Sequence, residues 1–190
     1  MNCFIVGGGS SLDEIDLSRL KGRDVIVCNE GILVYPDPTV LVWLDADFYP
    51  RFRKHIDGKP FKKYCRSTVM TCQYADDIEP LLTAPLYPGF HGRDGLKRGI
   101  YSGEEKLTGI AAVSLAIALG YDKIYLLGYD GGEVDGKLHF TGYTNKERDV
   151  YSKRLNRYEV FKGYDIVNCS LKSRIKTFPK QRIEDVLSAV

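Results

Sequence analysis

A glycine- and serine-rich turn follows the first apolar run of the chain. Residues 3–6 read CFIV, and they are followed directly by Gly7, Gly8, Gly9, Ser10 and Ser11. Glycines let the backbone come close to a ligand and turn its N–H groups toward it, and two hydroxyls add donors. The pattern predicts a phosphate-binding turn, although it is neither GxGxxG nor a lysine-bearing P-loop. A tight connection between a strand and a helix is the alternative.

Polar residues also follow the next two apolar runs. Asn29 comes after residues 25–28 and can both donate and accept, as contact with a nucleotide base or ribose requires, although it could equally be a turn former. Asp45 and Asp47 come after residues 40–44 and resemble the DxD pair with which many nucleotide-sugar transferases hold a divalent cation. The pair therefore suggests Mg²⁺ or Mn²⁺ bridging phosphates, whereas Asp47 could instead cap a following helix.

A histidine and a carboxylate are the candidates for catalysis. Asp130 lies at the end of the apolar run 123–128, and His139 follows after a pair of glycines. His139 could act as a general base or neutralise a phosphate, and a packed loop histidine is the alternative. Three basic residues of a glycine-rich stretch could close over a diphosphate: Arg93, Lys97 and Arg98.

The elements that must position these residues follow from hydrophobic patterning. Continuous apolar runs without alternation indicate strands that are covered on both faces, as in a parallel sheet. Such runs occupy residues 3–6, 25–28, 40–44, 123–128 and 165–168, and a vaguer one covers 62–72.

Helical patterns alternate with these runs. Residues 107–119 are apolar on nearly every side, which indicates a buried helix that ends at Gly120. Further helices are expected at 48–56, at 146–162 and at 183–189. The alternation predicts a doubly wound, mostly parallel Rossmann-like α/β sheet with helices on both faces, in a single domain over residues 1–190.

Residues 75–105 interrupt this alternation. They contain three prolines and five glycines, and a long stretch with little regular structure is often a lid or a binding loop. A surface loop without function is the alternative.

Composition excludes several classes of protein. The 190 residues are 44% hydrophobic and carry 27 Lys+Arg against 25 Asp+Glu, which excludes a disordered chain. No apolar run reaches about 18 residues, so no membrane span is expected. The five cysteines form no CxxC pair and no signal peptide is recognisable, so we expect a reduced, cytoplasmic protein. These features are also compatible with a homo-oligomer.

The near-neutral total conceals an alternation of charge along the chain. Residues 1–50 and 99–145 are acidic, whereas residues 51–98 and 146–190 are basic. A protein that coats nucleic acid would be more uniformly basic, so the sequence carries no strong nucleic-acid signal. Basic residues in 91–98 and 172–180 are expected to face the Gly7–Ser11 turn, unless the charges only keep the surface solvated.

Three segments resemble the bacterial lipooligosaccharide sialyltransferases. Residues 5–20, IVGGGSSLDEIDLSRL, resemble the opening of that family, in which a G-N-G-P-S-L turn leads into an EID-SRL phrase. The second-strand phrase VCN at residues 27–29 also resembles the family. Thr108-Gly109, AIALGY at 116–121 and IYLLGYD at 124–130 resemble its T-S-G, A-I-A-L-G-Y and I-Y-L-S-G-I-D run.

The resemblance extends to a wider Rossmann-like group that includes archaeal 6-hydroxymethylpterin diphosphokinase, flagellin-glycosylation accessory proteins and short phage-encoded members. Residues 168–173, NCSLKS, resemble the N-x-S-x-x-S phrase of that group. The resemblance implies that the Gly8–Ser11 turn and Asn29 hold the nucleotide of an activated donor. It also implies that Thr108 and Gly109 approach its base or phosphate, where a helix N-terminus favours an anion.

The chain departs from the sialyltransferase pattern at several positions. The family's asparagine in the first turn is Gly8 here, and its proline is Ser10. The family has tyrosines after the G-I-D strand that stabilise the leaving phosphate, whereas Gly131 and Gly132 follow here.

Three functions are compatible with these features. The first is a transferase that moves a sugar from a nucleotide-sugar donor to an unidentified acceptor, with His139 as base or phosphate partner. The second is a Mg²⁺-dependent ATP diphosphokinase-like enzyme, which would need Asp45 and Asp47. The third is a non-catalytic nucleotide-binding module.

Overall fold

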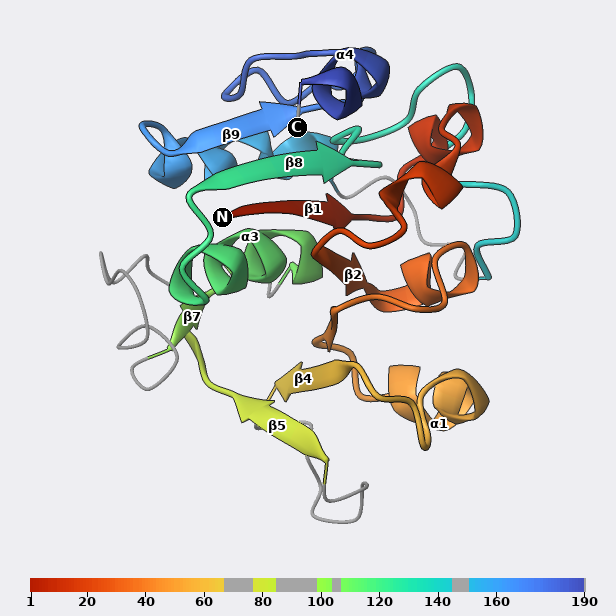
Figure 1. Ribbon diagram of the computed structural model, residues 1–190. Coiled ribbons are helices and arrows are strands. Elements are labelled where there is room, and N and C mark those ends of the chain that lie inside the picture. The colour runs from red at the N-terminus through yellow and green to blue at the C-terminus, as the bar shows by residue number, and fades with distance from the viewer. Residues whose placement is uncertain (67–76, 85–98, 104–106, 145–150, 190) are drawn as a thin grey trace.

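A computed structural model describes residues 1–66, 77–84, 99–103, 107–144 and 151–189. Its centre is a seven-stranded sheet in the order β5-β4-β3-β2-β1-β8-β9, and each neighbouring pair is parallel (Figure 1). The predicted parallel, doubly wound sheet is confirmed.

The strands of this sheet begin and end close to the apolar runs. They are β1 (Asn2–Val6), β2 (Val25–Cys28), β3 (Val40–Trp43), β4 (Lys62–Arg66), β5 (Ile78–Leu81), β8 (Lys123–Leu127) and β9 (Asp165–Asn168). A separate parallel pair consists of β6 (Thr83–Ala84) and β7 (Ile100–Tyr101). The α-helices are α1 (Phe48–Phe52), α3 (Thr108–Ala118) and α4 (Ile183–Ser188). The 3-10 helices are η1 (Ser10–Glu14), η2 (Leu17–Leu20), η3 (Asn29–Leu33), η4 (Arg53–His55) and η5 (Ser152–Phe161).

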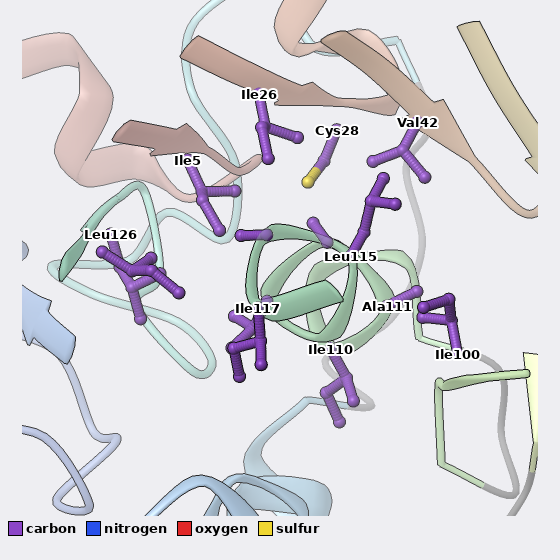
Figure 2. Packing of buried hydrophobic residues seen from close by; sticks show 14 of the residues in the cluster. Ile5, Ile26, Cys28, Val42, Ile100, Ile110, Ala111, Leu115, Ile117 and Leu126 are labelled. Atoms are coloured by element: carbon purple, nitrogen blue, oxygen red, sulfur yellow. The ribbon is translucent and has the colours of Figure 1, made fainter. Parts of the chain in front are cut away.

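Alternate residues of each strand enter two separate cores, which is why the strands are apolar throughout. On one face, Ile5, Ile26 and Val42 surround α3, as Figure 2 shows. On the other face, Val6 and Trp43 pack with the 3-10 helices η1 to η3, with α1 and with α4.

Helix α3 is buried along its whole length, as predicted. It ends in a Schellman motif, in which the Gly120 N–H donates to Ile117 O (3.0 Å) and the Tyr121 N–H donates to Ala116 O (3.2 Å). Gly120 has a φ of +88°, which glycine adopts without strain.

The direction of the strand order reverses between β1 and β8. From β1 the chain proceeds through β2 to β5 on one side, whereas β8 and β9 lie on the other side (Figure 1). In open α/β sheets, the crevice beyond the carboxyl ends of the strands at such a reversal is where ligands bind. The Gly7–Ser11 turn and the Gly128–Asp130 turn both lie at this point.

The segment 146–162 was expected to form an amphipathic α-helix, but its described part is the 3-10 helix η5. Leu155, Tyr158 and Phe161 are spaced by three residues, and side chains at this spacing are eclipsed on one side of a 3-10 helix. All three pack against the core around α3. The three-residue repeat, rather than the helical pattern with a four-residue step, decided the local structure.

Two other predicted elements differ in extent. The strand expected at 62–72 is described only as Lys62–Arg66, and residues 67–76 lie outside the described part. The stretch 75–105 contains three short strands, β5, β6 and β7, so it is more regular than expected. Residues 85–98, which include most of the predicted lid, lie outside the described residues.

No helix among the described residues is long and apolar enough to cross a membrane.

The four cysteines of the described residues are all buried: Cys3, Cys28, Cys65 and Cys169. Burial raises the pKa of each thiol, and the pKa reaches about 12 for Cys28, Cys65 and Cys169. We therefore expect that a Cys72→Ser variant, which removes the one cysteine outside the described residues, reacts with a thiol reagent at pH 8 only after urea unfolds it.

The same shifts predict how stability changes at high pH. Between the pKa of an unfolded thiol and the raised pKa of the folded one, the unfolded chain holds fewer protons, so the free energy of unfolding should fall from about pH 8.5 upward. Urea titrations at neutral and alkaline pH measure this decrease. In the labelling experiment, rapid reaction of the folded Cys72→Ser variant with the thiol reagent would contradict the burial of the other four cysteines.

Candidate functional site

A cavity of about 270 Å³ opens at the carboxyl edge of the sheet, between β1 and β8. Its walls come from the turns after β1 and β8, the ends of β2 and β3, the start of α3, the segment around residue 140 and helix η5. The lining residues are Gly7, Gly8, Gly9, Cys28, Asn29, Asp45, Leu107, Thr108, Gly109, Gly128, Tyr129, Asp130, Gly131, Gly132, Leu138, His139, Tyr143, Tyr151, Arg154 and Tyr158. The structure therefore brings together most of the predicted site residues.

The turn after β1 packs directly against the turn after β8. The Gly7 N–H donates to Leu127 O (2.8 Å) and the Gly9 N–H donates to Gly128 O (2.9 Å). A Cβ on Gly7 would lie 2.8 Å from Gly128 O. Gly7 is thus required by the contact between the two turns, and two of the three N–H groups that the sequence assigns to a phosphate are used within the protein.

Gly9 tests this close contact. Its φ of −72° suits any residue, but a Cβ would lie 2.5 Å from Asp130 Oδ2 and 2.7 Å from Gly128 O. We expect Gly9→Ala to lower the free energy of unfolding by about 1–3 kcal/mol, as overpacking does. Gly8→Ala is the matched control, because its nearest neighbour is a Tyr143 ring carbon at 3.1 Å. Equal urea stability of the two variants would contradict the steric argument.

Ser10 and Ser11 do not line the cavity, in contrast to the prediction that their hydroxyls bind a phosphate. The hydroxyl of Ser10 donates to Asp130 Oδ2 (3.3 Å), and that of Ser11 donates to Asp130 Oδ1 (2.5 Å). The N–H of Ser11 also donates to Asp130 Oδ2 (2.9 Å). Asp130 is 2% exposed and lines the cavity, and its carboxylate connects the two turns, while its predicted catalytic role stays a prediction.

The N-x-S-x-x-S phrase binds the other side of the same turn. Asn168 Nδ2 and the Ser173 hydroxyl both donate to Tyr129 O (3.0 and 2.6 Å), and the Tyr129 N–H donates to Ser170 Oγ (3.1 Å). All three polar side chains are buried. The phrase therefore holds the end of β8 in place, and Ser170 reaches Ser11 of the first turn at 2.8 Å.

Asn29, Asp45 and Thr108 meet at the second edge of the cavity. Asn29 Nδ2 donates to Thr108 Oγ1 (3.2 Å) and to Asp45 Oδ2 (3.4 Å). A carboxylate only accepts, so Asp45 requires the NH₂ side of the Asn29 amide to face it. Asn29 has a φ of +46°, which asparagine tolerates better than most residues, and the two contacts hold it there.

Asp47 does not join this group. It is absent from the cavity lining and forms an ion pair with Arg51 (3.4 Å), and it makes no side-chain cap on α1. Among the described residues no three His, Cys, Asp or Glu side chains are close enough to hold a metal ion. Asp45 therefore lines the cavity whereas Asp47 does not, and a cation held by the two carboxylates stays a prediction.

His139 lies beside the Gly7–Gly9 turn, as its predicted role requires. Residues 9 and 139 form an isolated antiparallel bridge, and His139 Nδ1 is 3.1 Å from Gly8 O. A carbonyl only accepts, so Nδ1 carries the proton and Nε2 is the basic nitrogen of the neutral ring. Tyr143 stacks on the imidazole with centroids 4.0 Å apart, and Tyr151 contacts it edge-on at 6.0 Å.

Sequence reasoning missed the aromatic and cationic wall of the cavity. Tyr143, Tyr151 and Tyr158 line it together with Arg154 and with Tyr129. Burial raises the pKa of Tyr129 and of Tyr158, so both hydroxyls stay protonated, and that of Tyr129 donates to Gly109 O (2.9 Å). Tyrosines therefore line the cavity, and three of them come from later in the chain than the glycines that follow Asp130. The signal in the sequence that could have indicated this wall is the spacing of residues 151, 154 and 158, which places three such side chains on one segment.

Of the two basic stretches that were expected to face the Gly7–Ser11 turn, the structure describes residues 172–180 and not residues 91–98. Arg93, Lys97 and Arg98 lie outside the described residues. The segment 172–180 touches the site through its backbone, because the Arg174 N–H donates to Asp130 O (2.7 Å). Lys172, however, pairs with Glu14 and Asp135 and does not line the cavity.

No protein-family model and no curated protein matches this sequence. Solved structures do match. The sialyltransferase CstII from Campylobacter jejuni in complex with cytidine-5'-monophosphate aligns with 94% of this chain and 84% of its own, at 20% identity and a TM-score of 0.57. The chain has the fold of a sialyltransferase. The monofunctional α-2,3-sialyltransferase Cst-I from the same organism aligns with 94% of this chain and 79% of its own, at 19% identity and a TM-score of 0.51.

A further α-2,3-sialyltransferase from Campylobacter jejuni, in apo form, aligns with 95% of this chain and 79% of its own, at 22% identity and a TM-score of 0.52. The resemblance to the sialyltransferase group is therefore confirmed at the level of the fold.

Proposed function

We propose that this protein is a transferase that uses a nucleotide-sugar donor. The observation that carries the proposal is the cavity at the β1/β8 reversal, where Arg154 and the ring of His139 face the same space as Gly7, Gly8 and Gly9. One cation and several tyrosine hydroxyls are suited to a phosphate group whose negative charge grows during transfer. The fold supports the proposal, because a sialyltransferase of the same fold was crystallised with cytidine-5'-monophosphate.

Several residues that line the cavity have proposed roles that follow from their positions. Asn29 and Thr108 lie at one edge of the cavity, where the N-terminal end of α3 favours an anion or a base. Arg154 stabilises the leaving phosphate. As the bond between the anomeric carbon and the phosphate oxygen breaks, an acceptor hydroxyl bonds to that carbon and its proton passes to His139 Nε2.

The ATP-dependent alternative receives less support. It would need Asp45 and Asp47 to hold Mg²⁺ at the phosphates, and of these two carboxylates Asp45 lines the cavity whereas Asp47 pairs with Arg51 and does not. A non-catalytic nucleotide-binding module would share the same cavity, and product formation distinguishes it.

Thermal-shift measurements with CMP, UDP, GDP, ATP and their sugar conjugates, each with and without Mg²⁺, test the proposal. At a ligand concentration of about 100 times Kd, a bound nucleotide stabilises by about 2.7 kcal/mol, which for a chain of this size corresponds to roughly 5–10 °C. We expect a metal-independent shift with a nucleoside monophosphate or its sugar conjugate. A shift only with ATP plus Mg²⁺ would favour the diphosphokinase, and no shift with any nucleotide would refute nucleotide binding.

Transfer itself is tested with the stabilising sugar conjugate as donor. His139→Ala should abolish product formation, and His55→Ala, a histidine of η4 outside the cavity, is the matched control. If the wild type binds the sugar conjugate but forms no product with any of a panel of sugar acceptors, the protein is a non-catalytic nucleotide-binding module.

A further inference from the structure

The segment Thr141-Gly142-Tyr143-Thr144 is held by a carboxylate at each end. Asp13 accepts from the N–H and from the hydroxyl of Thr141, both at 2.8 Å. Glu30 accepts from the N–H (2.5 Å) and from the hydroxyl (2.9 Å) of Thr144. The two carboxylates come from η1 and η3, the segments that follow β1 and β2.

Both carboxylates are well suited to fix this segment. Glu30 is 2% exposed and is also paired with Arg51 (3.4 Å), so it is held from two sides. Asp13 also pairs with Lys137 (3.5 Å). Burial acts to raise the pKa of Asp13, but the hydrogen bonds from Thr141 and the charge of Lys137 outweigh it and lower the pKa. Hydrogen bonds to ionised acceptors are about twice as strong as neutral ones.

The residue between the two threonines is the one that stacks on His139. The ring planes of Tyr143 and His139 differ by 11°. On the other side, a Cβ on Gly8 would come within 3.1 Å of the Tyr143 ring, so the ring fills the space that a side chain at position 8 would take. The orientation of the imidazole therefore depends on Tyr143, and the position of Tyr143 depends on its two flanking threonines.

We infer that Asp13 and Glu30 are positioning residues, which hold Tyr143 against His139 and thereby orient the imidazole toward the nucleotide site. The inference rests on the proposed function for its catalytic meaning, but the orientation itself is a property of the protein without ligand. Neither carboxylate lines the cavity. We therefore expect their effect on a ligand to pass through Tyr143 and His139.

The test uses Glu30→Gln and Asp13→Asn, with Glu14→Gln as the matched control. A glutamine at position 30 keeps one acceptor, loses one of the two bonds from Thr144 and turns an NH₂ group toward Arg51. Glu14 is a neighbouring exposed carboxylate that pairs with Lys172 and not with the segment. Thr144→Val removes the hydroxyl that donates to Glu30 and accepts from Arg51, but it keeps the Glu30 carboxylate and the bond from the Thr144 N–H, so it serves if Glu30→Gln does not fold.

The first readout is the Cε1–H proton resonance of His139 in the ligand-free protein. A stacked tyrosine shields this proton, and the signal is identified by its loss in His139→Gln. Tyr143→Phe should keep the upfield position and Tyr143→Leu should abolish it, which calibrates the effect. We expect the signal to move downfield in Glu30→Gln, Asp13→Asn and Thr144→Val, and to stay in place in Glu14→Gln.

The second readout is the Kd for CMP, measured by calorimetry. We expect an increase of about tenfold in Glu30→Gln, which is the size of one lost charge-assisted hydrogen bond. An unmoved His139 signal in the folded variants would overturn the inference, whether or not CMP binds. A moved signal with an unchanged Kd would overturn the link to the nucleotide site. If the wild type binds no nucleotide while the signal moves, the proposed function fails and the positioning of the ring stands.

Discussion

Replacement of Arg154 by alanine is expected to raise the Kd for CMP by about 10- to 100-fold. Arg154 is the one arginine or lysine among the described residues that line the cavity. A charge-assisted hydrogen bond to a phosphate contributes about 1.5–3 kcal/mol, and each 1.4 kcal/mol is tenfold in Kd. Calorimetric titration of the folded variant measures the loss, and Arg154→Lys should recover part of it, because lysine keeps the charge but not the planar fork.

Arg157→Ala is the control for this prediction. Arg157 lies on the same 3-10 helix as Arg154, one turn further along the chain, and does not line the cavity. If positive charge acted on CMP only in a general way, both substitutions would raise the Kd for CMP equally. Equal losses, or an unchanged Kd in Arg154→Ala, would remove Arg154 from the phosphate site.

The second large effect is expected on the free energy of unfolding, when Asp130 is replaced by alanine. Asp130→Ala should lower the free energy of unfolding by about 2–4 kcal/mol, because it leaves the N–H of Ser11 without its buried acceptor and removes one acceptor from each of the hydroxyls of Ser10 and Ser11. Ser11→Ala, which removes only one partner, should cost about 1 kcal/mol. Urea denaturation with a constant m-value measures both.

Asp122→Ala serves as the matched control for Asp130→Ala. Asp122 pairs with the N-terminal amine, and its side chain is 83% exposed, so its loss should cost less than about 1 kcal/mol. An Asp130→Ala variant that is as stable as the wild type but inactive would support the catalytic role that the sequence suggested for Asp130. A destabilised variant would confirm that this carboxylate connects the turns after β1 and β8.

The comparison of Asp130 with His139 shows where sequence reasoning ends. Both follow the apolar run of β8, and both side-chain types suit catalysis. The two residues differ in their hydrogen-bond partners, which lie far away in the sequence. Asp130 accepts from Ser11, 119 residues earlier, and His139 contacts Gly8 O, 131 residues earlier. Which donors and acceptors are already used inside the protein is decided by such long-range contacts, and a local pattern contains no information about them.

The aromatic wall illustrates the same limit. Tyr143, Tyr151 and Tyr158 belong to no phosphate-binding motif, and the sequence has Gly131 and Gly132 where the family resemblance predicts tyrosines. Helix η5 brings Tyr151, Arg154 and Tyr158 to the cavity because Leu155 and Phe161 anchor it on the core around α3. The sequence predicts an α-helix for this segment, whereas the structure has a 3-10 helix, and local spacing alone does not show that Arg154 lies at the cavity.

The sequence by itself determined the parallel sheet, the buried helix with its glycine end and the edge at which the cavity opens. These features follow from local periodicity and from the polar residues that end each apolar run, because burial on both faces demands continuous apolar strands. Only the tertiary structure decided that Ser10, Ser11 and Asp130 bind one another, that Asp45 orients Asn29, and that Asp13 and Glu30 hold Tyr143 on His139. The physical reason is that a polar group can serve a ligand only where folding has left it near the cavity with a donor or acceptor position still unused.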